Sequence, residues 1–338
     1  MLVGKIKYYT MHKQLLIAAL LVLGACKKNS EANSNTGNGG GTDTTTTPPP
    51  AAVVRKLVIA DQSQNRVIIA DVSAKTIVWE WKPAGILANA SWFVNMSDAK
   101  AVCNSQYILA TASAGGVALV RIADKKTLFY AYAGNGNTHS AELLPDGNIV
   151  AACSTGGYLI LFKTDTAAAQ PYSGYTRKVA LADAHNVVWD YQRQLLWSAA
   201  GNKLYAYRYN FNCAQPDLTL TDSIALPASG CHDLFPDYGK DSLLLSTSSK
   251  VWSVSLKTRT VAQISNYARI KSVSPGPSPY VTVLMQSIDT DQQWWNDTII
   301  DLNANPVYQL SGLKAYKARW LLNNTFSYPA GAGLTLCK

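Results

Sequence analysis

Three stretches of the chain share one pattern: His139–Ala152 reads HSAELLPDGNIVAA, His185–Ala200 reads HNVVWDYQRQLLWSAA, and His232–Thr247 reads HDLFPDYGKDSLLLST. Each stretch begins with a histidine, continues into an apolar run, passes through a polar turn and ends in a second apolar run. Short apolar runs that are bounded by turn residues are typical of β-strands joined by hairpins. The pattern therefore predicts an all-β fold built from repeated hairpins.

The same pattern recurs three more times, with lysine in place of histidine at its start. KAVCNSQYILATA begins at Lys100, KSVSPGPSPYVTVLM begins at Lys271, and KARWLLNN begins at Lys317. The six starts are separated by 39, 46, 47, 39 and 46 residues, which matches the length of a four-stranded propeller blade, about 40–50 residues. We therefore expect a six-bladed β-propeller, with seven blades as the alternative if two units have been merged.

The two ends of this domain complement each other. The unit that starts at Lys317 has room for only one or two strands, whereas the domain opens with three strand-like runs, Leu57–Ala60, Arg66–Val72 and Ile77–Trp81. One C-terminal strand and three N-terminal strands together make one blade. Such pairing closes the ring and leaves no free sheet edge.

One blade carries a recognisable motif. The stretch RVIIADVSAKTIVWEW, from Arg66 to Trp81, resembles the quinoprotein-like blade pattern at Asp71, Lys75, Thr76 and Trp79, although Ala74 stands where that pattern usually has glycine. The resemblance covers one blade well and two others loosely. It implies the propeller fold but carries over no quinone site, so the cofactor is unknown. The whole chain resembles an uncharacterised family of lipid-anchored bacterial propellers.

The N-terminus indicates export. Leu15–Ala25 is an apolar run of eleven residues preceded by Lys13; it is too short to span a membrane, which takes about 20 residues, and is typical of a signal peptide. The run ends in Leu-Gly-Ala before Cys26, which resembles the lipobox of Gram-negative lipoproteins, in which that cysteine carries the lipid. The alternative is a plain signal peptide with an incidental cysteine.

These features divide the chain into three parts. Residues 1–25 are the predicted signal peptide, 26–52 the lipidated cysteine and a linker, and 53–338 the propeller. From Asn29 to Pro50, 19 of 22 residues are Asn, Ser, Thr, Gly or Pro, a composition that cannot bury a core. We expect a protein outside the cytoplasm, anchored to the membrane by lipid alone and facing the periplasm or the cell surface.

Charge and cysteine content exclude several classes. The net charge of +9 falls to +6 without Lys5, Lys7 and Lys13 of the signal peptide, which is not a nucleic-acid-binding signature for a chain of this size. We expect a monomer with no nucleic-acid partner. Five cysteines remain after Cys26; their odd number and wide spacing predict mostly small buried residues, with room for one disulfide.

Apart from His12, the chain has three histidines, and all three stand at the start of a predicted innermost strand. Because these strands line the channel of a propeller, we expect His139, His185 and His232 to meet at the channel mouth as candidate catalytic residues. Lys100, Lys271 and Lys317 would form the opposite half of the ring as ligand-binding residues. One half titrates near neutral pH and the other is positive, which favours an anionic ligand. The alternative is that these side chains only hold neighbouring blades together.

Three function classes stay open. The first is binding of a small anion such as an acidic saccharide, with Trp92, Trp294 and Trp295 as stacking candidates. The second is an enzyme acting on acidic or sulfated glycans, either a lyase with histidine as general base or a sulfotransferase-like enzyme with a histidine nucleophile. The third is a protein-interaction platform. A three-histidine metal site is disfavoured because the lysines would repel a bare cation, so we expect no metal.

Overall fold

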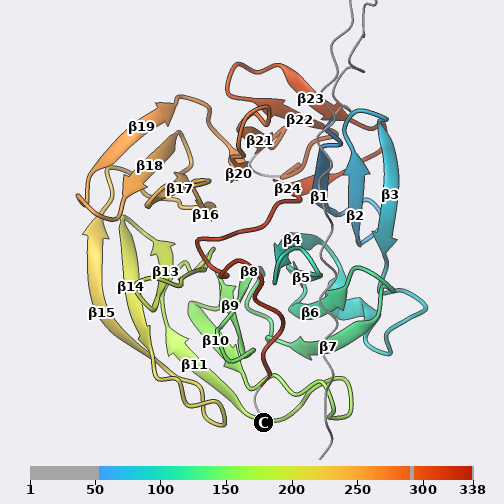
Figure 1. The fold of residues 1–338 in the computed structure, drawn as a ribbon, viewed down its shortest axis with the longest axis vertical. Coiled ribbons are helices and arrows are strands. Elements are labelled where there is room, and N and C mark those ends of the chain that lie inside the picture. The colour runs from blue at the N-terminus through green and yellow to red at the C-terminus, as the bar shows by residue number, and fades with distance from the viewer. Residues whose placement is uncertain (1–52, 290–292, 337–338) are drawn as a thin grey trace, which may run out of the picture. The chain divides into compact units, whose positions relative to one another are not determined.

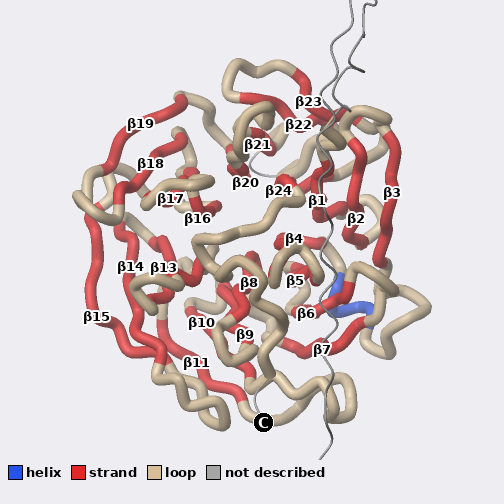
Figure 2. The backbone as a smooth tube through the Cα atoms, viewed as in Figure 1, coloured by secondary structure: helices blue, strands red, loops and turns tan. Residues whose placement is uncertain are grey.

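The structure is a computed structural model that describes residues 53–289 and 293–336. The predicted signal peptide, Cys26 and the linker lie outside the described residues. Figure 1 shows a ring of blades around a central channel, and the strands dominate every blade in Figure 2. Within the described residues, no helix is long and apolar enough to cross a membrane.

The domain is a propeller of six four-stranded antiparallel sheets, as the repeat predicts. One blade has the strand order β24-β1-β2-β3, so the C-terminal strand pairs with the N-terminal strand and closes the ring. The other blades are β4–β7, β8–β11, β12–β15, β16–β19 and β20–β23. The predicted closure is confirmed, and the blade number is six rather than seven.

Each blade runs from an innermost strand outward. The innermost strands are β4 (Met96–Val102), β8 (Thr138–Leu143), β12 (Val188–Asp190), β16 (Asp233–Pro236), β20 (Ile270–Ser274) and β24 (Ala315–Trp320). The second strands are β1 (Lys56–Asp61), β5 (Tyr107–Ala112), β9 (Ile149–Cys153), β13 (Leu195–Ala200), β17 (Ser242–Ser246) and β21 (Val283–Gln286). The third strands are β2 (Arg66–Asp71), β6 (Gly116–Arg121), β10 (Tyr158–Phe162), β14 (Lys203–Tyr209), β18 (Val251–Ser255) and β22 (Thr298–Asp301). The outer strands are β3 (Thr76–Trp81), β7 (Thr127–Tyr132), β11 (Thr176–Ala180), β15 (Leu218–Ala225), β19 (Val261–Ser265) and β23 (Pro306–Gln309). A 3₁₀ helix, η1 (Ala90–Phe93), precedes β4.

The apolar core lies between neighbouring blades. Val58 and Ile69 of one blade, for example, share a buried cluster with Ile108 and Val120 of the next. Because both faces of the inner sheets are covered in this way, their strands read as continuous apolar runs rather than as alternating ones. This packing explains why short runs such as that of β5 mark strands so clearly.

Four of the six innermost strands carry one extra residue near their start. At each of these places two residues of the inner strand face one residue of the neighbouring strand, and the extra residues are Ser97, His139, Lys271 and Tyr316. Such a bulge interrupts the ladder locally and re-aims side chains. Three of these residues, His139, Lys271 and Tyr316, face the channel mouth, whereas Ser97 is buried and donates to the Thr138 carbonyl.

The C-terminal segment covers the channel end opposite the mouth. Figure 1 shows it crossing the centre of the ring after β24. The Asn104 side chain, in the turn that follows β4, donates to the Ala332 carbonyl. The Tyr328 hydroxyl donates to the Glu142 carboxylate on β8. The segment is thus tied to the far ends of two inner strands.

The cysteines follow the sequence-based expectation in the described part of the chain. Cys103, Cys153 and Cys231 are free and buried, and burial raises the pKa of each thiol. Cys213 is disulfide-bonded. Cys231 packs in an apolar cluster beside His232 rather than in the channel.

Candidate functional site

A cavity of about 550 Å³ opens at the channel mouth, and residues from all six blades line it. This volume lies within the ~300–1,000 Å³ of pockets that hold small molecules. The ionisable lining consists of His139, His185, His232, Lys271 and Tyr316. The neutral lining consists of the amides of Gln62, Asn95 and Asn137, the hydroxyls of Ser113 and Ser248, and the indoles of Trp294 and Trp295. Among the described residues, no carboxylate lines this mouth pocket.

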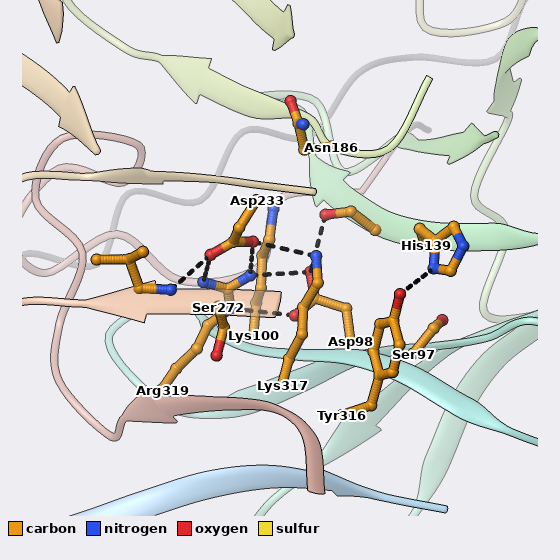
Figure 3. Close-up of polar contacts among 12 residues, drawn as sticks. Ser97, Asp98, Lys100, His139, Asn186, Asp233, Ser272, Tyr316, Lys317 and Arg319 are labelled. Carbon is orange, nitrogen blue, oxygen red and sulfur yellow. Dashed lines mark hydrogen bonds and ion pairs between the residues drawn. The ribbon is translucent and has the colours of Figure 1, made fainter. Parts of the chain in front are cut away.

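The structure brings the three histidines together. The ring centroids of His139 and His185 lie 4.8 Å apart in a stacked arrangement, and His232 meets His185 edge-on at 5.2 Å. His139 also stacks on Tyr316, whose hydroxyl lies 3.3 Å from His139 Nδ1, as Figure 3 shows. One wall of the mouth pocket is therefore a row of aromatic rings with polar edges.

Two of these histidines stay neutral at physiological pH. Burial, followed by the charge of His185, holds the pKa of His139 well below its ordinary value. Burial and the charge of Lys271 do the same to the pKa of His232. His139 and His232 therefore offer hydrogen bonds without adding positive charge.

His185 has a fixed tautomer. Its Nδ1 lies 3.1 Å from the carbonyl oxygen and 3.0 Å from a carboxylate oxygen of Asp183. Both partners only accept hydrogen bonds, so Nδ1 carries the hydrogen and Nε2 of the neutral ring keeps its lone pair. Asp183 adopts a left-handed conformation with φ of 61°, which aspartate tolerates better than most residues. No repeat in the sequence singles out Asp183, although its position two residues before His185 is a signal for a His–carboxylate pair.

Lys271 is the cation of the mouth pocket. Its side chain is only 3% exposed, and Nζ lies 3.4 Å from His232 Nε2 and 5.9 Å from the centroid of the Trp294 ring. Burial, followed by the charge of Lys317, lowers the pKa of Lys271 to about 8. Because the ammonium group can only donate, His232 Nε2 accepts, and the hydrogen of the neutral ring lies on Nδ1. That Nδ1 is buried and has no hydrogen-bond partner among the described residues.

Lys100 and Lys317 do not line the mouth pocket, contrary to the expected half-ring of lysines. Lys100 Nζ donates to the Val187 carbonyl at 2.6 Å and to Glu142 at 3.2 Å. Lys317 Nζ pairs with Asp233 at 3.0 Å. Both ammonium groups are buried in ion pairs deeper in the channel and have no free face for a ligand.

A buried ion cluster forms the floor beneath the mouth pocket (Figure 3). Arg319 donates to both carboxylate oxygens of Asp98, at 3.0 and 3.2 Å, and to both of Asp233, at 3.1 and 2.7 Å. Burial alone would raise the pKa of Asp98, but the charges of Arg319 and the nearby lysines outweigh it and hold that pKa well below its usual range. Three cations, Lys100, Lys317 and Arg319, face three carboxylates, Asp98, Glu142 and Asp233, so the cluster is neutral overall.

The repeat spacing aligned these two lysines with the wrong position of the other inner strands. Ser97 and Tyr316, rather than Lys100 and Lys317, occupy the position that His139 and Lys271 hold in their blades. Lys100 lies three residues and Lys317 one residue further along their strands. The extra residue of a bulge leaves no mark in residue type, so spacing alone could not reveal it.

The other predicted candidates divide between two environments. Trp294 and Trp295 line the mouth pocket, and Trp294 is 43% exposed at its rim. Trp92 stacks on Tyr132 at a centroid distance of 4.9 Å and is not part of the lining. In the part of the chain that the structure describes, no three His, Cys, Asp or Glu side chains are grouped to hold a metal ion.

The fold and this site define a six-bladed β-propeller with a polar pocket, lined by no carboxylate of the described residues, at one end of a filled channel. The chain belongs to DUF6528, a family of unknown function, whose model matches residues 11–338. No curated protein matches the chain.

A solved structure agrees on the fold. The chain is similar to a protein of unknown function from Bacteroides caccae, with 15% identity, a TM-score of 0.52, and coverage of 79% of this chain and 99% of that one. It also matches dihydro-heme d1 dehydrogenase NirN in complex with DHE, with 15% identity, a TM-score of 0.45, and coverage of 78% of this chain and 56% of that one. At 15% identity the likeness to the Bacteroides caccae protein concerns the fold and not the activity.

Proposed function

We propose that the protein binds an acidic saccharide in the mouth pocket, with Lys271 as the group that holds its carboxylate. The observation that carries this proposal is the lining itself, which contains a buried ammonium group and no carboxylate among the described residues. An ammonium group that is almost buried attracts a counter-ion more strongly than an exposed one, because water screens it less. A carboxylate on the ligand supplies that counter-ion.

The rest of the lining favours a saccharide over a simple inorganic anion. Three amide and two hydroxyl side chains offer both donors and acceptors, which suit sugar hydroxyl groups. The indoles of Trp294 and Trp295 offer flat apolar faces, which suit the C–H face of a pyranose ring. The volume of about 550 Å³ also exceeds what a small inorganic ion would fill.

A matched pair of ligands tests the proposal. Tetragalacturonate and its carboxyl-reduced derivative differ only in that hydroxymethyl groups replace the carboxylates. Calorimetric titration should show binding of the first and much weaker binding of the second. Lys271→Met should lower the affinity for tetragalacturonate about 10- to 100-fold, the value of one hydrogen bond to a charged group. The matched control is Lys257→Met, which removes an exposed lysine remote from the mouth pocket. Equal affinity for both ligands, or no effect of Lys271→Met, would refute the proposal.

A second candidate function is catalysis on the same ligand, favoured by the Asp183–His185 pair. A histidine whose Nδ1–H is held by a carboxylate presents Nε2 as a general base. With Lys271 neutralising the substrate carboxylate, His185 Nε2 would take the C5 proton next to that carboxylate, as an acidic-glycan lyase requires. The electron pair left at C5 would form a C4–C5 double bond and break the C4–O bond, and the leaving glycosidic oxygen would take up a proton from water. Incubation with polygalacturonate should then release unsaturated products that absorb in the ultraviolet, and His185→Gln should abolish this release while binding persists. Binding without any product would leave the protein a binding module.

We also propose that the propeller is displayed outside the cytoplasm by a lipid on Cys26. The support is the apolar run that ends in Leu-Gly-Ala-Cys and the Asn/Ser/Thr/Gly/Pro-rich stretch that follows it. A saccharide-binding pocket on a tethered domain would meet glycans in the periplasm or at the cell surface.

A further inference from the structure

We infer that the mouth pocket takes the end of an acidic saccharide chain and not a segment from its middle. This inference rests on the proposed function and adds which part of the ligand enters. Its basis is that residues of all six blades surround the pocket and that a buried ion cluster lies beneath it.

The walls come from the whole ring. Gln62 lies in the blade of β1, Asn95 in that of β4, Asn137 in that of β8, Ser248 in that of β17 and Lys271 in that of β20; His185 represents the remaining blade. A groove that binds the middle of a polymer needs two open sides, through which the chain enters and leaves. A pocket with walls from all six blades has neither.

The floor is closed by the ion cluster. Asp98, Asp233, Lys317 and Arg319 are each at most 1% exposed, so no water-sized space adjoins them in this layer. Below it, Tyr328 of the C-terminal segment donates to Glu142 and covers the far end of the channel. A chain that enters the mouth pocket therefore cannot pass through the channel.

The recognition group lies inside the walls rather than on the rim. Lys271 is 3% exposed and Tyr316 is 5% exposed, and Lys271 Nζ lies 6.0 Å from the centroid of the Tyr316 ring. A carboxylate reaches this ammonium group only when its own sugar ring enters the pocket. A terminal residue can enter with one glycosidic bond pointing outward, whereas an internal residue would have to bring in both of its neighbours.

The test compares tetragalacturonate with long polygalacturonate at equal concentrations of uronate residues. The number of occupied sites should follow the concentration of chain ends. At equal uronate concentration the polymer should therefore occupy far fewer sites than the tetramer. Partial hydrolysis of the polymer should raise its binding capacity in proportion to the ends that it creates. Lys271→Met should weaken binding of the tetramer and of the hydrolysed polymer by the same factor, which assigns both signals to this pocket.

The outcomes separate the two proposals. If the tetramer binds and the polymer occupies sites in proportion to its concentration of uronate residues, the end-binding inference is overturned. The proposed function would then still stand. If neither tetragalacturonate nor the partially hydrolysed polygalacturonate binds, the proposed function is overturned, and the inference with it.

Discussion

Replacing Arg319 with methionine tests how the channel is held together. The guanidinium makes four charge-assisted hydrogen bonds to Asp98 and Asp233 and is 1% exposed. At about 1.5–3 kcal/mol each, four separate bonds would total about 6–12 kcal/mol, which is most of the stability of a typical domain, but they share one cation and Lys317 remains beside both carboxylates. The loss expected for breaking one buried ion pair, about 3–5 kcal/mol, therefore applies.

The assay is urea-induced unfolding followed by tryptophan fluorescence. The control, Arg121→Met, removes an exposed arginine that pairs with Asp124 and should leave the unfolding midpoint unchanged, because water screens that pair. The pKa of Asp98 and of Asp233 is depressed in the folded protein, so the stability that Arg319 supplies is present at neutral pH. It is lost as pH falls below about 4, because aspartates of the unfolded chain take up protons there. The difference in unfolding free energy between the wild type and Arg319→Met should accordingly become smaller in acid. A variant as stable as Arg121→Met at pH 7 would refute the role assigned to the cluster.

Three further perturbations test the closure of the ring, the attachment of the C-terminal segment and the lipid on Cys26. Deleting Lys317–Lys338 removes most of β24 and exposes β1, so it should destabilise the entire ring; an unchanged melting midpoint would contradict closure by this strand. Tyr328→Phe leaves a buried oxygen of Glu142 without its donor and should cost about 1–3 kcal/mol in urea unfolding; a cost near zero would show that the C-terminal segment is not anchored there. Cys26→Ala should release the protein from the membrane fraction and abolish lipid labelling; continued pelleting of this variant, with no label on the wild type, would disprove the lipobox interpretation.

The sequence predicts the scaffold better than the site, and the reason is physical. Blades are repeated units whose apolar runs must be buried on both faces, so their number and the pairing of β24 with β1 follow from spacing alone. The mouth is different, because the hydrophobic pattern does not mark which residue of an inner strand stands at its bulge, and in two blades this residue is Ser97 or Tyr316 rather than the lysine further along. The prediction that Lys100 and Lys317 line the mouth pocket was therefore wrong, and both lysines lie in the ion cluster beneath it.

The floor of the pocket was missed for a related reason. Arg319 follows Lys317 at the two-residue spacing of a strand, so both side chains lie on the same face. Its carboxylate partners are on β4 and β16, far apart in sequence, and only the closed ring brings them together. No local pattern around Asp98 or Asp233 marks this pairing.

The pH dependence of saccharide affinity tests the central claim most directly. A carboxylate bound by the Lys271 ammonium requires that lysine to be protonated, and its pKa is lowered to about 8. His139 and His232 have pKa values far below neutrality, so neither adds charge between pH 6 and the alkaline range. The affinity for tetragalacturonate, measured by calorimetry from pH 6 upward, should hold below pH 8 and then fall about tenfold per pH unit, since one pH unit past the pKa costs about 1.4 kcal/mol. His185→Gln should keep this alkaline fall, and Lys271→Met should lose it. An affinity that is independent of pH across this range, or the same fall in Lys271→Met, would contradict Lys271 as the group that holds the anion.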